Sequence, residues 1–491
     1  MESVLHKVHG LVWGIPSLVL ILGVGLYLSI RTRFVQIRLF PRALKGFLSL
    51  FRRKTGPGVS PLQALCTALA ATVGTGNIAG VAGAVAIGGP GAIFWMWVCA
   101  LIGMATKFAE ATLSVRYRVR ENGEFRGGPM YMITRGLGSR WKWLAGCYAF
   151  FGIVAAFGVG NATQINAVIT GLRQAVTAFG GTPEGWMDLG AGLVLAVLVA
   201  LLLSGGAVRI GRAAERLVPF AAVAYLLLCL LVLVARFQAI PAAFSAIIRG
   251  AWTPGAVSGG LIGSALTTLR VGVSRGVFTN EAGMGTAGIA HAGADVAHPV
   301  DQGLMGIMEV FLDTVVICTM TALVILVSGA PIPYGTDPGA ALTAEAFSAV
   351  CGPWTTVFIT GALCCFAFAT VLGWGLYGIR CAQFLFGASS PRFFVFFQAL
   401  AVVLGAVLNT GTVWLLSETV NGLMAIPNLI ALAALASELV RLTGACKHGG
   451  TNEDLDQCQS LRAVAHAEIP PPGGKSQGSG QENLPSEHRS A

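Results

Sequence analysis

The 491-residue chain is 55% hydrophobic and only 11% charged, against roughly 25% charged residues in soluble domains. With a mean hydropathy of +0.73, it has too few charged groups to cover a surface in water, which excludes a soluble globular protein and favours a bilayer as its solvent. The net charge of +10 does not indicate nucleic acid binding, because the lysines and arginines gather in short gaps between apolar runs.

Eleven apolar stretches qualify as membrane-spanning helices, each of which needs about 20 residues to cross the hydrocarbon core. They cover residues 11–30, 62–87, 91–115, 143–172, 189–204, 213–235, 255–285, 303–328, 354–378, 393–408 and 412–440. Basic residues, not a small-residue cleavage site, follow the first stretch, so we expect it to be retained. The polar composition of residues 448–491 predicts a disordered tail after a single transmembrane domain, 1–447.

The basic residues predict the orientation of the chain. They concentrate after the first, third, fifth and ninth stretches, whereas the opposite gaps hold only Lys7, Arg173, Arg236 and Arg249. Because loops rich in Lys and Arg stay in the cytoplasm, we expect the N-terminus outside and the C-terminus in the cytoplasm.

Two of the stretches carry closely spaced glycines and polar residues at membrane depth. These segments are AATVGTGNIAG at 70–80 and RGVFTNEAGMG at 275–285. Glycine is about 0.8–1.0 kcal/mol less favourable than alanine inside a helix, which permits unwinding, although glycine also forms close-packing surfaces between membrane helices. With the first helix set aside, the two segments lead two sets of five helices, at about 62–235 and 255–440. That placement indicates a transporter built from inverted repeats.

Breaks of this kind can bind a zwitterion together with a cation. Unwinding frees backbone N–H groups at the start of one half-helix, where they and the helix dipole favour a carboxylate. Carbonyl groups freed at the end of the other half-helix favour an ammonium group or Na⁺. A small amino acid and a cation can therefore share one site with few charged side chains.

Ionisable residues also lie inside the apolar stretches, namely Lys107, Glu110, Arg270, Arg275, Glu281, Glu309 and Asp313. Lys107 and Glu110 are three residues apart, and we expect them to pair, with the lysine reaching toward the cytoplasmic interface. For the others we expect gate or structural pairs first and proton coupling second. The cysteines contain no C-x-x-C motif and are expected to be small buried hydrophobes.

Five segments extend these motifs along the chain. They are GGPGAIFWMWVCALIGMATKFAEATLSVRYR at 88–118, GGPMYMI at 127–133, SRGVFTNEAGMGTA at 274–287, HPVDQGLMGIMEVFLDTVVICTMTALVIL at 298–326 and FAFATVLGWGLYG at 366–378. From about residue 10 to 445 their order and spacing resemble the alanine or glycine:cation symporter family. The resemblance implies an all-α LeuT-like fold of about 11 transmembrane helices, with one N-terminal helix, a 5+5 inverted repeat and two broken helices. It implies Na⁺- or H⁺-coupled uptake of alanine or glycine by alternating access, without a cofactor, by a single functional chain in the bacterial inner membrane.

The resemblance also implies particular contacts. By motif it places the substrate at Gly74, Thr75, Gly76 and Asn77 in the first break, at Phe278 and Asn280 in the second, and at Gln164, Thr370 and Trp374. It places Na⁺ on the carbonyl groups of Ala70 and Val73 and the hydroxyl of Thr370, oxygen ligands that suit a hard cation. Ala369 stands where many relatives have serine, so one candidate hydroxyl ligand is missing.

Two other classes of function are alternatives. An ion channel needs a continuous pore, which the two matched breaks do not require. A membrane-embedded enzyme is the second alternative, but no H-E-x-x-H motif is present. The letters G-x-S-x-G occur at 272–276, inside an apolar stretch, and at 474–478, in the polar tail, not on the strand-to-helix turn that the hydrolase motif requires. The sequence also has no G-x-x-x-x-G-K-[ST] loop for ATP, which argues against ATP-driven transport by this chain.

Overall fold

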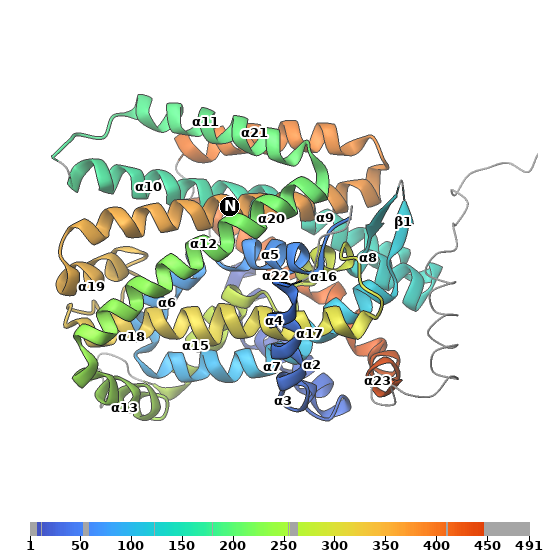
Figure 1. Cartoon of the computed structure of the whole chain (residues 1–491), viewed down its shortest axis with the longest axis horizontal. Helices are drawn as coiled ribbons and strands as arrows, with labels where there is room; N and C mark the ends of the chain where they lie inside the picture. Colours follow the sequence, from blue (N-terminus) through green and yellow to red (C-terminus); the bar gives the residue numbers. More distant parts are fainter. Residues whose placement is uncertain are drawn as a thin grey trace, which may run out of the picture.

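The computed structural model describes residues 7–10, 12–52, 58–121, 123–178, 180–253, 255, 264–408 and 411–445. The described chain is a helical bundle with one short β-hairpin (Figure 1). The predicted disordered tail, 448–491, lies outside the described residues.

The long helices follow the predicted stretches. The first stretch is α2 (Ile15–Arg31). The first set of five contains α5 (Pro61–Thr72), η1 (Gly76–Gly80) and α6 (Val81–Gly88), then α7 (Gly91–Arg116), α9 (Lys142–Phe157), η4 (Gly158–Ala162), α10 (Thr163–Ala178), α11 (Gly185–Leu203) and α12 (Gly206–Ala235). The second set contains α15 (Ala265–Asn280) and α16 (Thr286–Ala292), then α17 (Pro299–Val310), η6 (Phe311–Cys318), α18 (Thr319–Ser328), α20 (Trp354–Phe386), α21 (Ser390–Val407) and α22 (Gly411–Ala434). Each predicted stretch therefore overlaps a helix or a broken helix.

Not every overlap is a complete span by length and composition. Within the described residues seven helices are long and apolar enough to cross a membrane, or nine if each strongly bent pair is one span. The bent pairs are α5 with η1 and α6, at 53°, and α22 with α23 (Ala436–Ala445), at 57°. Because α2 has 17 residues and α15 has 16, the number of eleven spans stays a prediction.

Helices in equal positions of the two sets pack against each other. The second helices, α7 and α17, are in contact, as are the third helices, α9–α10 and α20, and the fourth, α11 and α21. In Figure 1, α11 and α21 lie side by side along one edge of the bundle. The fifth helices cross over, with α12 on α20 and α22 on α9. This reciprocal pattern is what two repeats related by a two-fold axis produce.

Several short elements were not predicted, because they lie in the gaps between apolar stretches. They are α3 (Val35–Arg38), α4 (Phe40–Leu50), β1 (Val119–Glu121), β2 (Glu124–Arg126), α8 (Pro129–Tyr131), η2 (Met132–Leu137), η3 (Ser139–Trp141), η5 (Phe237–Ala239), α13 (Ile240–Gly250) and α19 (Ala341–Cys351). The antiparallel hairpin β1–β2 is held by Arg118, whose guanidinium lies 3.7 Å from the centre of the Phe125 ring and donates to the Ala294 carbonyl. The hairpin is thereby fixed to the end of α16.

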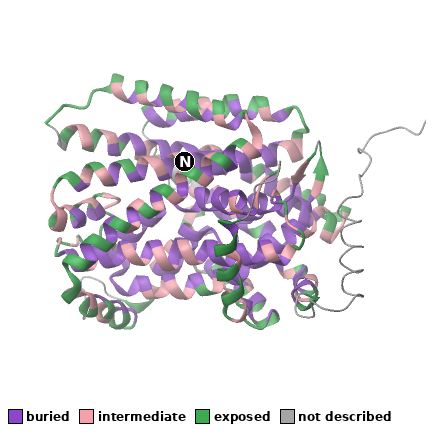
Figure 2. Ribbon diagram, viewed as in Figure 1, coloured by how far each residue is buried: buried purple, intermediate pink, exposed green. Residues whose placement is uncertain are grey.

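Burial separates the interior of the bundle from its apolar outer face. Figure 2 shows buried positions concentrated on the central helices and exposed positions along the peripheral ones. Exposed aliphatic and aromatic side chains such as Val197, Leu227 and Phe396 lie on α11, α12 and α21. An outer face of this kind suits lipid, which makes no hydrogen bonds to the protein.

Candidate substrate and ion site

The first break follows a regularly capped helix. Ser60 and Gln63 form a reciprocal capping box at the start of α5, which fixes where the helix begins. The helix ends at Thr72, and Val73 adopts an extended conformation with φ −76° and ψ 101°. The side-chain oxygen of Asn77 then accepts a hydrogen bond from the Gly74 N–H at 2.9 Å. The Asn77 amide therefore replaces a helical carbonyl partner and holds the chain in its unwound form.

Thr370 on α20 lies against this break. Its hydroxyl oxygen is 3.0 Å from the Ala70 carbonyl oxygen and 3.0 Å from that of Phe366. A Cβ on Gly74 would sit 2.9 Å from the same hydroxyl, so the absence of a side chain at Gly74 permits the approach. The structure thus brings together three predicted residues, Ala70, Gly74 and Thr370, with Val73 between the first two.

Gln164 joins the same group from the other side. The Thr75 hydroxyl donates to its side-chain oxygen at 3.4 Å, and its NH₂ group donates to the Val159 carbonyl at 3.2 Å. Gln164 lies directly after the π-helical turn η4, which passes so close to α20 that a Cβ on Gly160 would overlap Trp374. The turn therefore brings Gln164 and α20 to the first break together.

The second break lies at the end of the predicted segment. Within 275–285, α15 remains helical to Asn280 and the break covers residues 281–285. Gly276 does not interrupt the helix because it faces Cys99 and Met96 of α7, a close-packing role. The left-handed residues come after it, with φ of 52° at Glu281, 98° at Gly283 and 79° at Gly285.

A buried glutamate of α7 holds the second break. One carboxylate oxygen of Glu110 accepts hydrogen bonds from the N–H groups of Gly283, at 2.9 Å, and Gly285, at 3.0 Å. The Asn428 amide donates to the same oxygen at 2.8 Å. Asn280 adds a local cap, since its side-chain oxygen accepts from the Ala282 N–H at 3.0 Å. These contacts satisfy the backbone groups that unwinding exposes inside the membrane.

Trp374 contacts the second break, one helical turn along α20 from Thr370. Its indole N–H donates to one carboxylate oxygen of Glu281 at 3.1 Å, while the Thr286 hydroxyl donates to the other at 2.7 Å. Trp374 is fully buried. Adjacent turns of α20 therefore contact different breaks: Thr370 contacts the first break, and Trp374 contacts the second.

Asp313 and Thr314 on η6 connect the two breaks from the opposite side. The Asn77 amide donates to the Asp313 carboxylate at 2.7 Å, and the Asn280 amide donates to the Thr314 hydroxyl at 3.3 Å. The Thr314 hydroxyl lies 2.8 Å from the second Asp313 oxygen. The predicted contacts Asn77 and Asn280 thus have both ends of their amides engaged by the protein.

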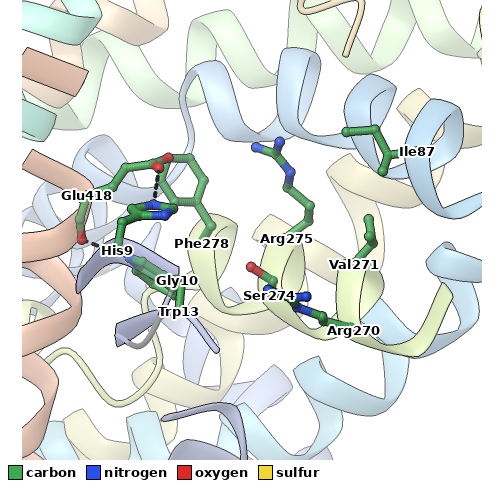
Figure 3. A pocket seen from close by; sticks show the side chains of 10 residues that line it. All are labelled: His9, Gly10, Trp13, Ile87, Arg270, Val271, Ser274, Arg275, Phe278 and Glu418. Carbon is green, nitrogen blue, oxygen red and sulfur yellow. Dashed lines mark hydrogen bonds and ion pairs between the residues drawn. The ribbon is translucent and has the colours of Figure 1, made fainter. Parts of the chain in front are cut away.

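Gly76 and Phe278 mark where the two broken helices touch. A Cβ on Gly76 would lie 3.2 Å from the Thr279 methyl carbon and 3.6 Å from a ring carbon of Phe278. The missing side chain of Gly76 therefore serves packing between η1 and α15. Phe278 also lines a cavity (Figure 3), so this residue contacts the first break and borders that cavity.

The comparisons with known proteins agree with this architecture. Residues 1–454 match the model of the sodium:alanine symporter family. The chain belongs to this family. It is 45% identical to the sodium/alanine symporter AgcS of Methanococcus maripaludis, over 92% of this chain and 98% of that protein. It is 37% identical to the probable sodium/glutamine symporter GlnT of Bacillus subtilis, over 89% of this chain and 88% of the relative.

The fold comparison supports the same assignment. The crystal structure of MhsT in complex with L-phenylalanine superposes with a TM-score of 0.52 at 14% identity, covering 79% of this chain and all of MhsT. The predicted LeuT-like helical fold is confirmed. As a member of the sodium:alanine symporter family, the protein is a multi-pass membrane transporter and not an enzyme.

In this family member the buried lysine of α7 has a different partner from the one predicted. The expected pair of Lys107 with Glu110 is wrong: the Lys107 ammonium lies 2.8 Å from Glu309, whose other oxygen lies 3.0 Å from His291. All of these side chains are fully buried, so the lysine does not reach the interface. The cause is that α7 packs along α17, so that Glu309 of α17 faces the lysine and neutralises it. Glu110 is then available to accept hydrogen bonds from the second break.

Several residues at the breaks were absent from the predicted site, among them Glu110, Glu281, Asp313 and Thr314. The three carboxylates were singled out only as charges at membrane depth, a signal that marks functional positions without naming partners. Thr314 carries no signal in the sequence, because a threonine in a membrane helix usually bonds to its own backbone.

Proposed function

We propose that this symporter couples inward Na⁺ movement to the uptake of a small neutral amino acid, alanine or glycine. The observation that carries the proposal is the position of α20, which touches both broken helices on neighbouring turns, at Ala70 through Thr370 and at Glu281 through Trp374. A helix in contact with both breaks can sense a ligand bound between them. Alternating access requires such coupling between the site and the repeats.

The end of α5 is the proposed Na⁺ site. The Thr370 hydroxyl has a second acceptor, the Phe366 carbonyl, at 3.0 Å. It can therefore give its hydrogen to Phe366 and keep a lone pair for a cation beside the Ala70 carbonyl. With the Val73 carbonyl these groups make an all-oxygen set, which suits Na⁺ as a hard cation.

The amino acid is proposed to bind next to this site. Its carboxylate would meet the N–H groups at Thr75 and Gly76, where the chain turns into η1 and the helix dipole favours negative charge. The side-chain oxygen of Gln164, 3.4 Å from the Thr75 hydroxyl, would accept from the ammonium group. Phe278 and Trp374 would bound the substrate side chain, which favours small residues.

Asp313 is proposed as a second acceptor of positive charge in the cycle. Its carboxylate is fully buried, and its hydrogen-bond partners among the described residues are the neutral groups Asn77, at 2.7 Å, and Thr314, at 2.8 Å. An isolated buried carboxylate is costly unless a proton or cation neutralises it. Because Asp313 is bonded to the first break, its neutralisation would be coupled to the conformation of that break.

Orientation and assembly follow from the same proposal. We place His9 and the start of α15 outside and α4 in the cytoplasm of a bacterial inner membrane, because the basic residues gather on the α4 side. All residues of the proposed site come from one chain, so a monomer would suffice for transport.

Uptake into proteoliposomes tests the function. The purified protein would be reconstituted and given labelled alanine with an inward Na⁺ gradient, an inward proton gradient or neither. We expect uptake with Na⁺, competition by glycine, and counterflow of labelled alanine, which a channel does not give. Accumulation driven by protons alone, or competition by glutamine but not by glycine, would overturn the ion or the substrate.

A further inference from the structure

Phe278 lines a cavity of about 250 Å³ beside α15 (Figure 3). It is enclosed by the N-terminal segment, α6, α15 and α22, and its lining includes His9, Trp13, Arg270, Ser274, Phe278 and Glu418. Its volume is close to that of small-molecule sites, which begin at about 300 Å³. Phe278 therefore borders this cavity, and its ring also lies 3.6 Å from where a Cβ on Gly76 would be.

The wall of the cavity at the N-terminal segment is built by specific contacts. His9 lies 3.0 Å from the Glu418 carboxylate, and the Trp13 indole N–H donates to the Glu418 carbonyl at 2.8 Å. These bonds fix the segment before α2 onto α22. They leave the second Glu418 carboxylate oxygen without a hydrogen-bond partner among the described residues.

The two arginines of the cavity differ in their partners. Arg275 is paired with Asp337 at 2.9 Å. Arg270 is exposed and makes no hydrogen bond or ion pair within the part of the chain that the structure describes. Arg270 and Ser274 are one helical turn apart on α15, and both line the cavity (Figure 3). A guanidinium with free donors is the group best suited to hold a carboxylate at two points.

We propose that this cavity is a second binding site for an amino acid, occupied before the substrate passes Phe278. Arg270 binds the carboxylate, with the Ser274 hydroxyl as a further donor, and Glu418 accepts from the ammonium group. The proposal rests on the function proposed above, since the ligand is the transported amino acid. Because a zwitterion has no net charge, long-range attraction does not draw it to Arg270. Arg270 would contribute to binding through direct hydrogen bonds to the carboxylate.

The test compares Arg270→Gln with Arg249→Gln, which removes an exposed arginine on the same proposed face outside the cavity. Na⁺-driven alanine uptake in proteoliposomes is measured over a range of alanine concentrations. We expect Arg270→Gln to raise KM about three- to tenfold with little change in kcat, since a charge-assisted hydrogen bond is lost before translocation. Arg270→Lys should recover part of the loss, and Arg249→Gln should match the wild type.

A second measurement uses a ligand that probes the cavity directly. The carboxylate 3-phenylpropionate should inhibit uptake by the wild type more strongly than its amide, and Arg270→Gln should remove that difference. An unchanged KM in Arg270→Gln, or equal inhibition of wild type and variant by the carboxylate, would overturn the second site. Failure of the wild type to transport alanine would instead refute the proposed function, so the two failures are distinguishable.

Discussion

The Asn77 side chain donates a hydrogen bond to the Asp313 carboxylate over 2.7 Å, joining positions 236 residues apart. The next residue, Thr314, accepts from Asn280 in the other broken helix. Two consecutive residues of η6 therefore form hydrogen bonds to the two broken helices, Asp313 to the first and Thr314 to the second. The Asp313 carboxylate is therefore in direct contact with the first break, where a change in its charge would act on Asn77.

Asp313→Asn should reduce coupled uptake about tenfold or more while leaving a folded protein. Asparagine keeps the size and one acceptor oxygen for Asn77, but it removes the negative charge that a proton or cation would neutralise. Uptake at saturating alanine is the measurement, with thermal unfolding as a check on folding. Asp301→Asn is the matched control, because Asp301 is a surface residue paired with Arg42. Full activity of Asp313→Asn would show that this charge takes no part in coupling.

Thr370→Ala should raise the Na⁺ concentration for half-maximal uptake about three- to tenfold, the effect of losing one hydrogen-bonding or ligand group. Alanine fits the space that threonine leaves, so the protein should still fold. Thr360→Ala on the same helix removes a hydroxyl far from the break and should behave like the wild type. Na⁺ dependence identical in all three proteins would place the ion elsewhere.

Lys107→Met should lower the free energy of unfolding by about 3–5 kcal/mol, because it leaves Glu309 buried without its main partner. Chemical unfolding of the detergent-solubilised protein measures the loss. Lys142→Met, at an exposed position, is the control and should be nearly neutral. A double variant, Lys107→Met with Glu309→Gln, should recover part of the loss, and equal stability of wild type and Lys107→Met would contradict a buried ion pair.

The orientation predicts which positions a membrane-impermeant thiol reagent reaches. Cysteine at Gln238, in η5, should be labelled from outside in intact cells, and cysteine at Lys45, in α4, only after permeabilisation. Both native residues are exposed, so access decides the result. Labelled peptides identified by mass separate these positions from the native cysteines, and the opposite pattern would invert the topology.

The sequence predicted the helices and the first break because those features depend on local composition. Apolar runs of membrane length determine where helices form, and the segment 70–80 combines glycines with polar side chains that tolerate unwinding. Where the helix ends within the segment 275–285 could not be predicted, because a glycine that packs, such as Gly276, and a glycine that turns, such as Gly283, look alike in a sequence. Only the neighbouring helix distinguishes them.

The partners of the buried charges could not be predicted for a related reason. Spacing along one helix pairs Lys107 with Glu110, three residues away, but the facing residue on α17 is closer. Lys107 and Glu309 are 202 positions apart, and their contact depends on how α7 packs on α17. Such contacts depend on the tertiary arrangement, which the spacing of residues along one helix does not contain.

Gly76→Ala tests the contact between the two broken helices. A Cβ at this position would lie 3.2 Å from the Thr279 methyl carbon, tighter than ordinary van der Waals contact, so η1 and α15 would have to separate. We expect at least about a tenfold weaker alanine affinity in purified protein, and a larger loss for Gly76→Val. Binding is the direct measurement, with thermal unfolding recorded on the same samples.

The double variant Gly76→Ala with Thr279→Ser separates packing from substrate contact. Serine at 279 lacks the methyl group that the new Cβ would meet, and it keeps the hydroxyl that donates to the Gly276 carbonyl at 3.0 Å. If Gly76 matters because the helices must approach, the double variant should regain most of the affinity, which is a strong coupling between the two positions. Thr279→Ser alone should bind nearly as well as the wild type. If the double variant binds as poorly as Gly76→Ala, the added methyl group instead obstructs the substrate carboxylate, and the proposed contact at the Gly76 N–H gains support.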